Sequence, residues 1–160
     1  VHAHRALRAI ERIGRERLGI TADDRLLATS RLFFSYPLAN SLFAGLKLGA
    51  TVILDPQWPT AATVAATVAA TQPTVLFSVP SLYRNLLQEG LAPTLVQAGV
   101  GRCVSAGEAL PASLRAAWRE HTGLAEHFQL KAKVAGPAGQ GRHQGGQGTD
   151  FHQVSLSMPG

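Results

Sequence analysis

Cysteine is almost missing from this 160-residue chain, because Cys103 is the only one. A single cysteine excludes an internal disulfide and fits a reducing compartment. Long apolar runs are also missing, since no stretch approaches the ~20 residues that a membrane span needs. The chain opens within a helical pattern and shows no signal peptide. We therefore expect a cytoplasmic protein that does not interact with a membrane.

Charged residues are scarce, at 16% of the chain, whereas hydrophobic residues make up 46%. This composition excludes a disordered chain and predicts one globular domain. The net charge of +5 raises the question of nucleic-acid binding. No basic run is interleaved with aromatic residues, however, and no nucleic-acid-binding module is present. Five arginines gather in the first helical stretch, which predicts a solvated basic face and leaves a partner-binding face as an alternative.

Segments typical of strands alternate with segments typical of helices. Strands are expected at 25–30, 50–54, 74–79 and 101–106, and helices at 2–20, 38–49, 61–72, 81–89 and 111–123. This alternation predicts an α/β fold built on a parallel sheet. The segment 50–54, "ATVIL", is apolar on both faces, which is typical of a buried parallel strand.

Three short loops, "FFSY", "SVPS" and "SAGEA", follow predicted strands. The carboxyl ends of parallel strands meet at one edge of a sheet, where ligands bind in such folds. We therefore predict a pocket there, with a plain tight turn as the alternative for "SAGEA". Tyr36 is equally compatible with an ordinary packed aromatic, and Glu108 with a solvated residue near a helix start.

Other residues that could act as nucleophiles or metal ligands have simpler interpretations. Cys103 lies on an apolar strand, which indicates a small buried hydrophobe and not a nucleophile. His2 and His4 are two positions apart and point to different faces of a helix, so we expect no metal site. No Walker-type phosphate loop and no dinucleotide fingerprint occur in the sequence.

The segments "VHAHR", "FFSYPLAN", "GATVIL", "QPTVLFSVPSLYRNLL" and "CVSAGEALPASLRAAWREHTGL" occur in an order that resembles the adenylate-forming acyl- and aryl-CoA synthetases. Within that superfamily the sequence is most similar to benzoate–CoA ligases. The resemblance covers residues 1–124 and rests on order and spacing, since each motif is short.

The resemblance implies a two-step ligase with ATP, Mg²⁺ and coenzyme A as cofactors and a small aromatic carboxylic acid as substrate. AMP is first attached to the carboxylate, and the coenzyme A thiol then displaces it. In the family, the loop matching Ser105, Ala106, Gly107, Glu108 and Ala109 lies against adenine and the acyl pocket. The positions matching Phe34, Tyr36, Asn40 and Ala106 would bind the acid.

Some family segments have no match in this sequence. The Gly/Ser/Thr-rich phosphate loop, the acidic turn that handles Mg²⁺, the ribose-binding Asp and the small domain with its catalytic Lys are missing. We therefore expect residues 1–124 to be a partial AMP-binding domain that contains no catalytic residue and no Mg²⁺ site and is inactive alone. The alternatives are a non-catalytic α/β remnant and a partner-binding module. Uncovered surfaces of such a slice would favour self-association.

Residues 125–160 have a different character, with seven of the sixteen glycines and no sustained periodicity. We interpret them as a disordered tail. The abrupt change after Leu124 also favours the hypothesis that this tail is a frame-shifted reading of the gene.

Overall fold

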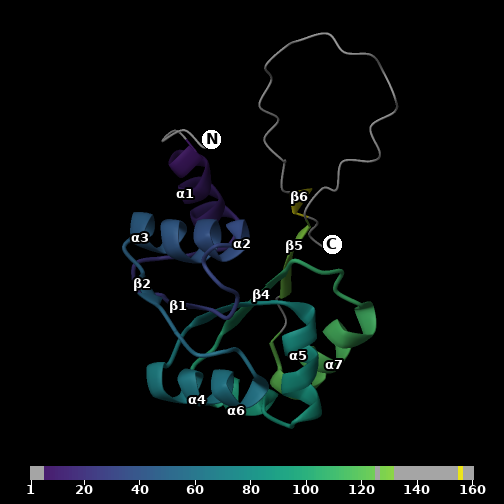
Figure 1. The fold of residues 1–160 in the computed structure, drawn as a ribbon. Helices are drawn as coiled ribbons and strands as arrows, with labels where there is room; N and C mark the ends of the chain where they lie inside the picture. Colours follow the sequence, from purple (N-terminus) through teal and green to yellow (C-terminus); the bar gives the residue numbers. More distant parts are fainter. Residues whose placement is uncertain (1–5, 125–126, 132–154, 157–160) are drawn as a thin grey trace, which may run out of the picture.

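The computed structural model describes residues 6–124, 127–131 and 155–156. These residues form a six-stranded sheet in the order β2-β1-β3-β4-β5-β6. The first five strands run parallel and β6 is antiparallel to β5. Helices cover both faces, with α1 to α3 on one side and α4 to α7 on the other (Figure 1). The predicted α/β class is confirmed.

The strands are β1 (Arg25–Ala28), β2 (Thr51–Ile53), β3 (Val75–Ser78), β4 (Arg102–Ala106), β5 (His127–Lys131) and β6 (Ser155–Leu156). The helices on the first face are α1 (Ala6–Glu16), α2 (Ser35–Pro37), the π-helix η1 (Leu38–Phe43) and α3 (Ala44–Leu48). Those on the second face are α4 (Ala61–Thr71), α5 (Pro80–Gln88), α6 (Ala92–Gln97) and α7 (Ala112–Thr122). Within the described part of the chain, no helix is long and apolar enough to cross a membrane.

The sheet separates two apolar cores, because successive strand residues point to opposite faces. Leu76 and Cys103 point toward α4 to α7, where Tyr83 and Trp118 are fully buried. Phe77 and Val104 point to the opposite core, beneath α1 and α3. The predicted burial of Cys103 is confirmed.

The ends of several helices lie where their residue types predict. Thr60 caps α4, since its hydroxyl accepts a hydrogen bond from the Thr63 amide at 3.1 Å. Gly49 ends α3 with a φ of +79°, a conformation that costs glycine little. The stretch expected as one helix over 38–49 instead begins with the π-helical segment η1.

Two elements differ from the sequence-based expectations. The segment expected as a buried strand becomes β2, which lies at the edge of the sheet with Thr51 exposed. An apolar pattern indicates that a strand can be buried on both faces, but it does not indicate which strands will pair with it. Helix α6 was not predicted, because its six residues are too few for a clear helical period.

The structure describes a few residues beyond the predicted boundary at Leu124. Residues 127–131 form β5, which pairs in parallel with β4. Ser155–Leu156 then pair with β5 as β6. The rest of the predicted tail, residues 125–126, 132–154 and 157–160, lies outside the described residues, as do His2 and His4. The frame-shift hypothesis stays a prediction.

A buried ion pair joins the start of β1 to β4. The Asp24 carboxylate contacts the Arg102 guanidinium and also accepts hydrogen bonds from the Thr21 amide at 2.8 Å and the Thr74 hydroxyl at 2.6 Å. Arg102 donates two further hydrogen bonds to the carbonyls of Leu18 and Gly19. This network anchors the turn after α1 to the middle of the sheet.

Gly45 marks the closest approach between α3 and the sheet. A Cβ atom at this position would lie 2.6 Å from Cγ2 of Val52 and 2.8 Å from Cδ1 of Leu26. We expect Gly45→Ala to lower the free energy of unfolding by about 1–3 kcal/mol through overpacking. Urea unfolding followed by circular dichroism measures the change. Gly101→Ala is the matched control, because its Cβ would meet only the Thr74 carbonyl oxygen at 4.0 Å; equal losses would contradict the prediction.

Candidate functional site

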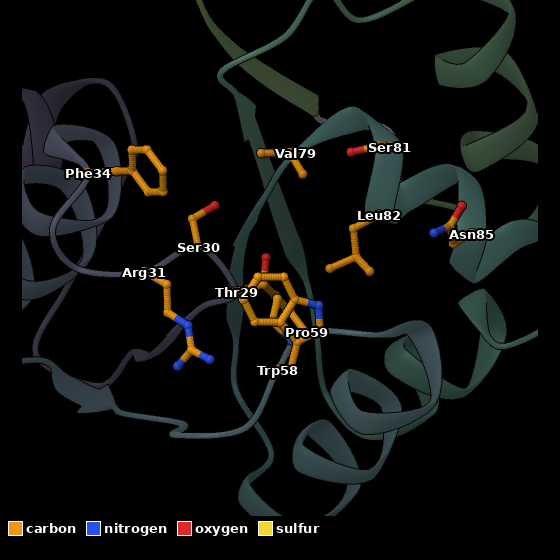
Figure 2. Close-up of a pocket in the computed structure, with 10 residues that line it drawn as sticks. All are labelled: Thr29, Ser30, Arg31, Phe34, Trp58, Pro59, Val79, Ser81, Leu82 and Asn85. Carbon is orange, nitrogen blue, oxygen red and sulfur yellow. The ribbon is translucent and has the colours of Figure 1, made fainter.

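A cavity of about 230 Å³ opens beyond the carboxyl ends of β1 and β3 (Figure 2). The loop after β1 supplies one wall, including Arg31 and Phe34. The loop between β2 and α4 supplies Trp58, and the first turns of α5 supply Leu82 and Asn85. The sheet edge predicted to bind a ligand therefore does carry a hollow.

Two aromatic rings and one cation dominate the wall of this cavity. Trp58 is 73% exposed and Phe34 is 56% exposed, so both rings offer uncovered apolar surface. The Arg31 guanidinium lies 5.5 Å from the centre of the Trp58 ring. Its Nη1 donates a hydrogen bond to the Pro56 carbonyl at 3.0 Å. Arg31 is the only charged residue among the ten that line the cavity, so its electrostatic character is cationic.

Two hydroxyl groups that line the cavity form hydrogen bonds to other groups of the protein. Thr29 Oγ1 lies 2.8 Å from Ser78 Oγ. The Ser81 hydroxyl donates a hydrogen bond to Glu108 Oε1 at 2.9 Å. This second bond ties the "SAGEA" loop to the "SVPS" loop at the wall of the cavity.

The residues predicted to bind an acid do not all face the cavity. Phe34 lines it, whereas Tyr36, Asn40 and Ala106 do not. The Tyr36 hydroxyl donates a hydrogen bond to the Val104 carbonyl at 2.9 Å, and Asn40 Nδ2 donates one to the Tyr36 carbonyl at 3.0 Å. Tyr36 thus holds the "FFSY" turn against β4, Asn40 bonds locally to the backbone of that turn, and Ala106 packs in the core at 4% exposure.

The loop predicted to lie on the adenine side divides into two parts. Ser105 and Ala106 are buried at the end of β4. Gly107, Glu108 and Ala109 are exposed, and Gly107 has a φ of +88°. An exposed backbone of small residues allows a flat ring to approach closely.

The buried ionisable groups near the site stay neutral. Burial raises the pKa of the Tyr36 and Tyr83 hydroxyls well above their ordinary value. Burial likewise raises the pKa of the Cys103 thiol to about 12. None of these groups is available as an anionic nucleophile or base at neutral pH. Within residues 6–124, 127–131 and 155–156, no group of three or more His, Cys, Asp or Glu residues could hold a metal ion.

Sequence reasoning missed Arg31, Trp58 and Asn85. In the segment "DPQWP", an aromatic residue in a loop after a strand is the available signal for Trp58. Arg31 and Asn85 carry no such signal, because they reach the cavity only when β1 and β3 become neighbours.

The fold and the cavity define an α/β protein with an aromatic and cationic cavity at the carboxyl edge of a parallel sheet. Its residues 1–130 match the model of the AMP-binding enzyme family. The chain belongs to that family.

Several proteins similar to this chain are named as aryl-CoA ligases. The chain is 44% identical over 124 residues to a 3-hydroxybenzoate–CoA/4-hydroxybenzoate–CoA ligase of Thauera aromatica, covering 78% of this chain and 24% of that ligase. It is 39% identical over 123 residues to a 3-hydroxybenzoate–CoA ligase of Aromatoleum, covering 77% and 24%. A solved benzoate CoA ligase from Burkholderia xenovorans superposes with a TM-score of 0.73 at 34% identity, covering 81% and 27%. The chain therefore spans about a quarter of the length of these relatives.

Proposed function

We propose that this chain supplies the aryl-acid-binding part of an ATP-dependent aryl-CoA ligase, which forms an acyl-adenylate and then the coenzyme A thioester. The observation that carries the proposal is the cavity lined by Phe34, Trp58 and Arg31. The names of the relatives, all ligases of aromatic acids, support it.

The cavity suits the two parts of an aromatic carboxylic acid. Contact with the exposed faces and edges of Phe34 and Trp58 would contribute favourable binding free energy to a flat ring. A carboxylate gains a charge-assisted hydrogen bond from a guanidinium, whose planar fork matches its two oxygens. Arg31 presents such a group beside the Trp58 ring. Together these residues would bind and orient the acid.

The "SAGEA" loop suits the nucleotide. Gly107, Glu108 and Ala109 are exposed next to the cavity, and the Ser81–Glu108 hydrogen bond fixes their position relative to its wall. The carboxylate would attack the α-phosphorus of ATP and release pyrophosphate, which gives an acyl-AMP anhydride. The coenzyme A thiol would then attack the acyl carbonyl, lose its proton and displace AMP to form the thioester. No step is assigned to Mg²⁺, for which the described residues offer no cluster of ligands.

The proposal predicts that Arg31→Ala weakens benzoate binding to the purified full chain. Loss of one charge-assisted hydrogen bond at a partly solvated site costs about 1.4 kcal/mol, a factor of ten in the dissociation constant. Trp58→Ala should weaken binding as well, since it removes an exposed aromatic wall. A ligand-observed NMR titration with benzoate measures both changes.

Arg12→Ala is the matched control, because it removes an equally cationic side chain from the exposed face of α1. It should leave benzoate binding unchanged. Absence of benzoate binding to the unmodified chain at millimolar concentration would overturn the proposal. Equal weakening by Arg31→Ala and Arg12→Ala would overturn the place assigned to the carboxylate.

A further inference from the structure

We infer that Asp55 is a positioning residue of the cavity: it fixes the loop between β2 and α4, residues 54–60, and so holds the Trp58 ring in place. This loop forms one wall of the cavity, although Asp55 itself is not among the residues that line it. The inference rests on the proposed function, because the ligand that would meet the fixed ring is the proposed aromatic acid.

The Trp58 ring has little packing of its own to hold it. It is 73% exposed, and an exposed side chain on a loop keeps one position only where the backbone beneath it is fixed. Figure 2 shows the Arg31 guanidinium next to this ring, 5.5 Å from its centre. Arg31 is itself bonded to the same loop, at the Pro56 carbonyl. The position of the Arg31–Trp58 pair therefore depends on the backbone of residues 54–60.

The Asp55 carboxylate bonds to two different parts of the chain. Its Oδ2 atom accepts a hydrogen bond from the Thr67 hydroxyl of α4 at 2.6 Å. Its Oδ1 atom accepts one from the Gln57 amide at 2.9 Å, which closes a tight turn immediately before Trp58. The bond to Thr67 is short and charge-assisted, a class about twice as strong as a neutral hydrogen bond. One side chain thus joins the start of the loop to a helix and shapes the backbone that carries the tryptophan.

Helix α4 presents its hydroxyl groups to this loop at helical spacing. Three threonines recur at every fourth position, which places them on one face: Thr63, Thr67 and Thr71. The Thr63 hydroxyl donates a hydrogen bond to the Trp58 carbonyl at 2.8 Å, as Thr67 does to Asp55. The Thr71 hydroxyl instead bonds within the helix, to the Thr67 carbonyl at 2.7 Å. Only the first two of the three therefore hold the loop.

The helix that Asp55 contacts is firmly placed on the sheet. Val64 and Val68 of α4 are 3% and 0% exposed and belong to the core cluster that also contains Leu27 and Leu76 of the sheet. The Asp55–Thr67 bond therefore joins an exposed loop to a well-packed element. A ligand that meets a ring already fixed in this way does not lose affinity by ordering it. Loss of the bond should raise the dissociation constant by about two- to tenfold.

The first measurement follows Trp58 directly, by fluorine NMR of the full chain labelled with 5-fluorotryptophan. The chain has two tryptophans, so Trp58→Phe assigns the two signals and the buried Trp118 is an internal reference. In Thr67→Val, which keeps the shape of the side chain and removes its hydroxyl, the Trp58 signal should narrow and move toward that of free fluorotryptophan. The Trp118 signal should stay in place.

Two variants of α4 are the controls for this measurement. Thr67→Ser retains the hydroxyl and should restore the Trp58 signal. Thr71→Val removes a hydroxyl one turn further along the same helix, which bonds only to the Thr67 carbonyl, and should leave the signal unchanged. The melting temperature of each variant should change by no more than about 4 °C, so a moved Trp58 signal reports the loop and not a loss of fold.

The second measurement is benzoate binding by ligand-observed NMR. Thr67→Val and Asp55→Ala should both weaken binding, whereas Thr67→Ser and Thr71→Val should stay within about twofold of the unmodified chain. Adding Thr67→Val to Asp55→Ala should weaken binding no further, because both substitutions remove the same hydrogen bond.

The outcomes separate this inference from the proposed function. An unchanged Trp58 signal in Thr67→Val, or an equal change in Thr71→Val, would overturn the role of Asp55 and leave the proposed function intact. A moved signal with unchanged benzoate affinity would overturn the link between the fixed ring and binding. Failure of benzoate to bind to the unmodified chain would overturn the proposed function, and the Trp58 signal would then decide by itself whether Asp55 fixes the loop.

Discussion

Replacing Trp118 by alanine is expected to lower the free energy of unfolding by about 3–5 kcal/mol, as removal of a buried aromatic residue does in well-packed cores. Trp118 belongs to α7, is 0% exposed and packs in the core cluster that also contains Tyr83 of α5. Its ring meets Tyr83 edge to face, with centroids 4.7 Å apart. Alanine would leave a cavity between two helices and the sheet. Because a domain has only about 5–15 kcal/mol in total, this loss would remove a large share of the free energy of unfolding.

Urea unfolding followed by circular dichroism measures this loss, and the chain contains its own control. Trp58→Ala removes the same side chain from a position that is 73% exposed, so we expect a change within about 0.5 kcal/mol. Similar losses at the two positions would show that the core beneath α5 and α7 does not dominate stability.

Asp24→Asn is expected to produce the second large loss, of roughly 2 kcal/mol or more. Removal of one partner from a buried ion pair costs about 3–5 kcal/mol, because the remaining charge is left uncompensated. The side chain of Asp24 is 8% exposed, whereas that of Arg102 is 24% exposed and keeps its bonds to Leu18 and Gly19, which reduces the cost. Asp23→Asn, next to it and exposed, is the matched control and should change stability little.

The Asp24 network also predicts how stability depends on pH. Burial by itself raises the pKa of Asp24, but hydrogen bonds from Arg102, Thr74 and Thr21 outweigh it, so the pKa in the folded chain lies below its ordinary value. The unfolded chain then binds the proton more readily than the folded one. The stabilisation is therefore complete above a pH of about 4 and is lost as the pH falls through the folded pKa. The difference in unfolding free energy between the unmodified chain and Asp24→Asn should shrink below pH 4; a constant difference down to pH 2 would contradict this assignment.

The candidate site was only partly predictable. The loops were located because residues such as Phe34 and Ser81 follow segments with strong strand patterns, and the carboxyl ends of parallel strands share an edge. The side chains that complete the cavity could not be assigned from local patterns. Trp58 and Arg31 are 27 positions apart in the chain, and the structure brings them together. Tyr36 is a residue that the sequence predicts to bind the acid but that does not line the cavity. Its hydroxyl instead donates a hydrogen bond to the Val104 carbonyl.

Several local features of this protein follow from residues that are close together in the chain. The Thr60 cap, the Gly49 stop and the alternation of strands with helices depend on neighbouring residues in the chain, and all three are found in the structure. Only the tertiary structure decided the strand order, which places "ATVIL" at an edge and adds β5 beyond Leu124. It also decided which side chains enclose the cavity. The physical reason is that strand pairing and burial are gained between segments far apart in the chain, so no local pattern specifies which neighbour each segment obtains.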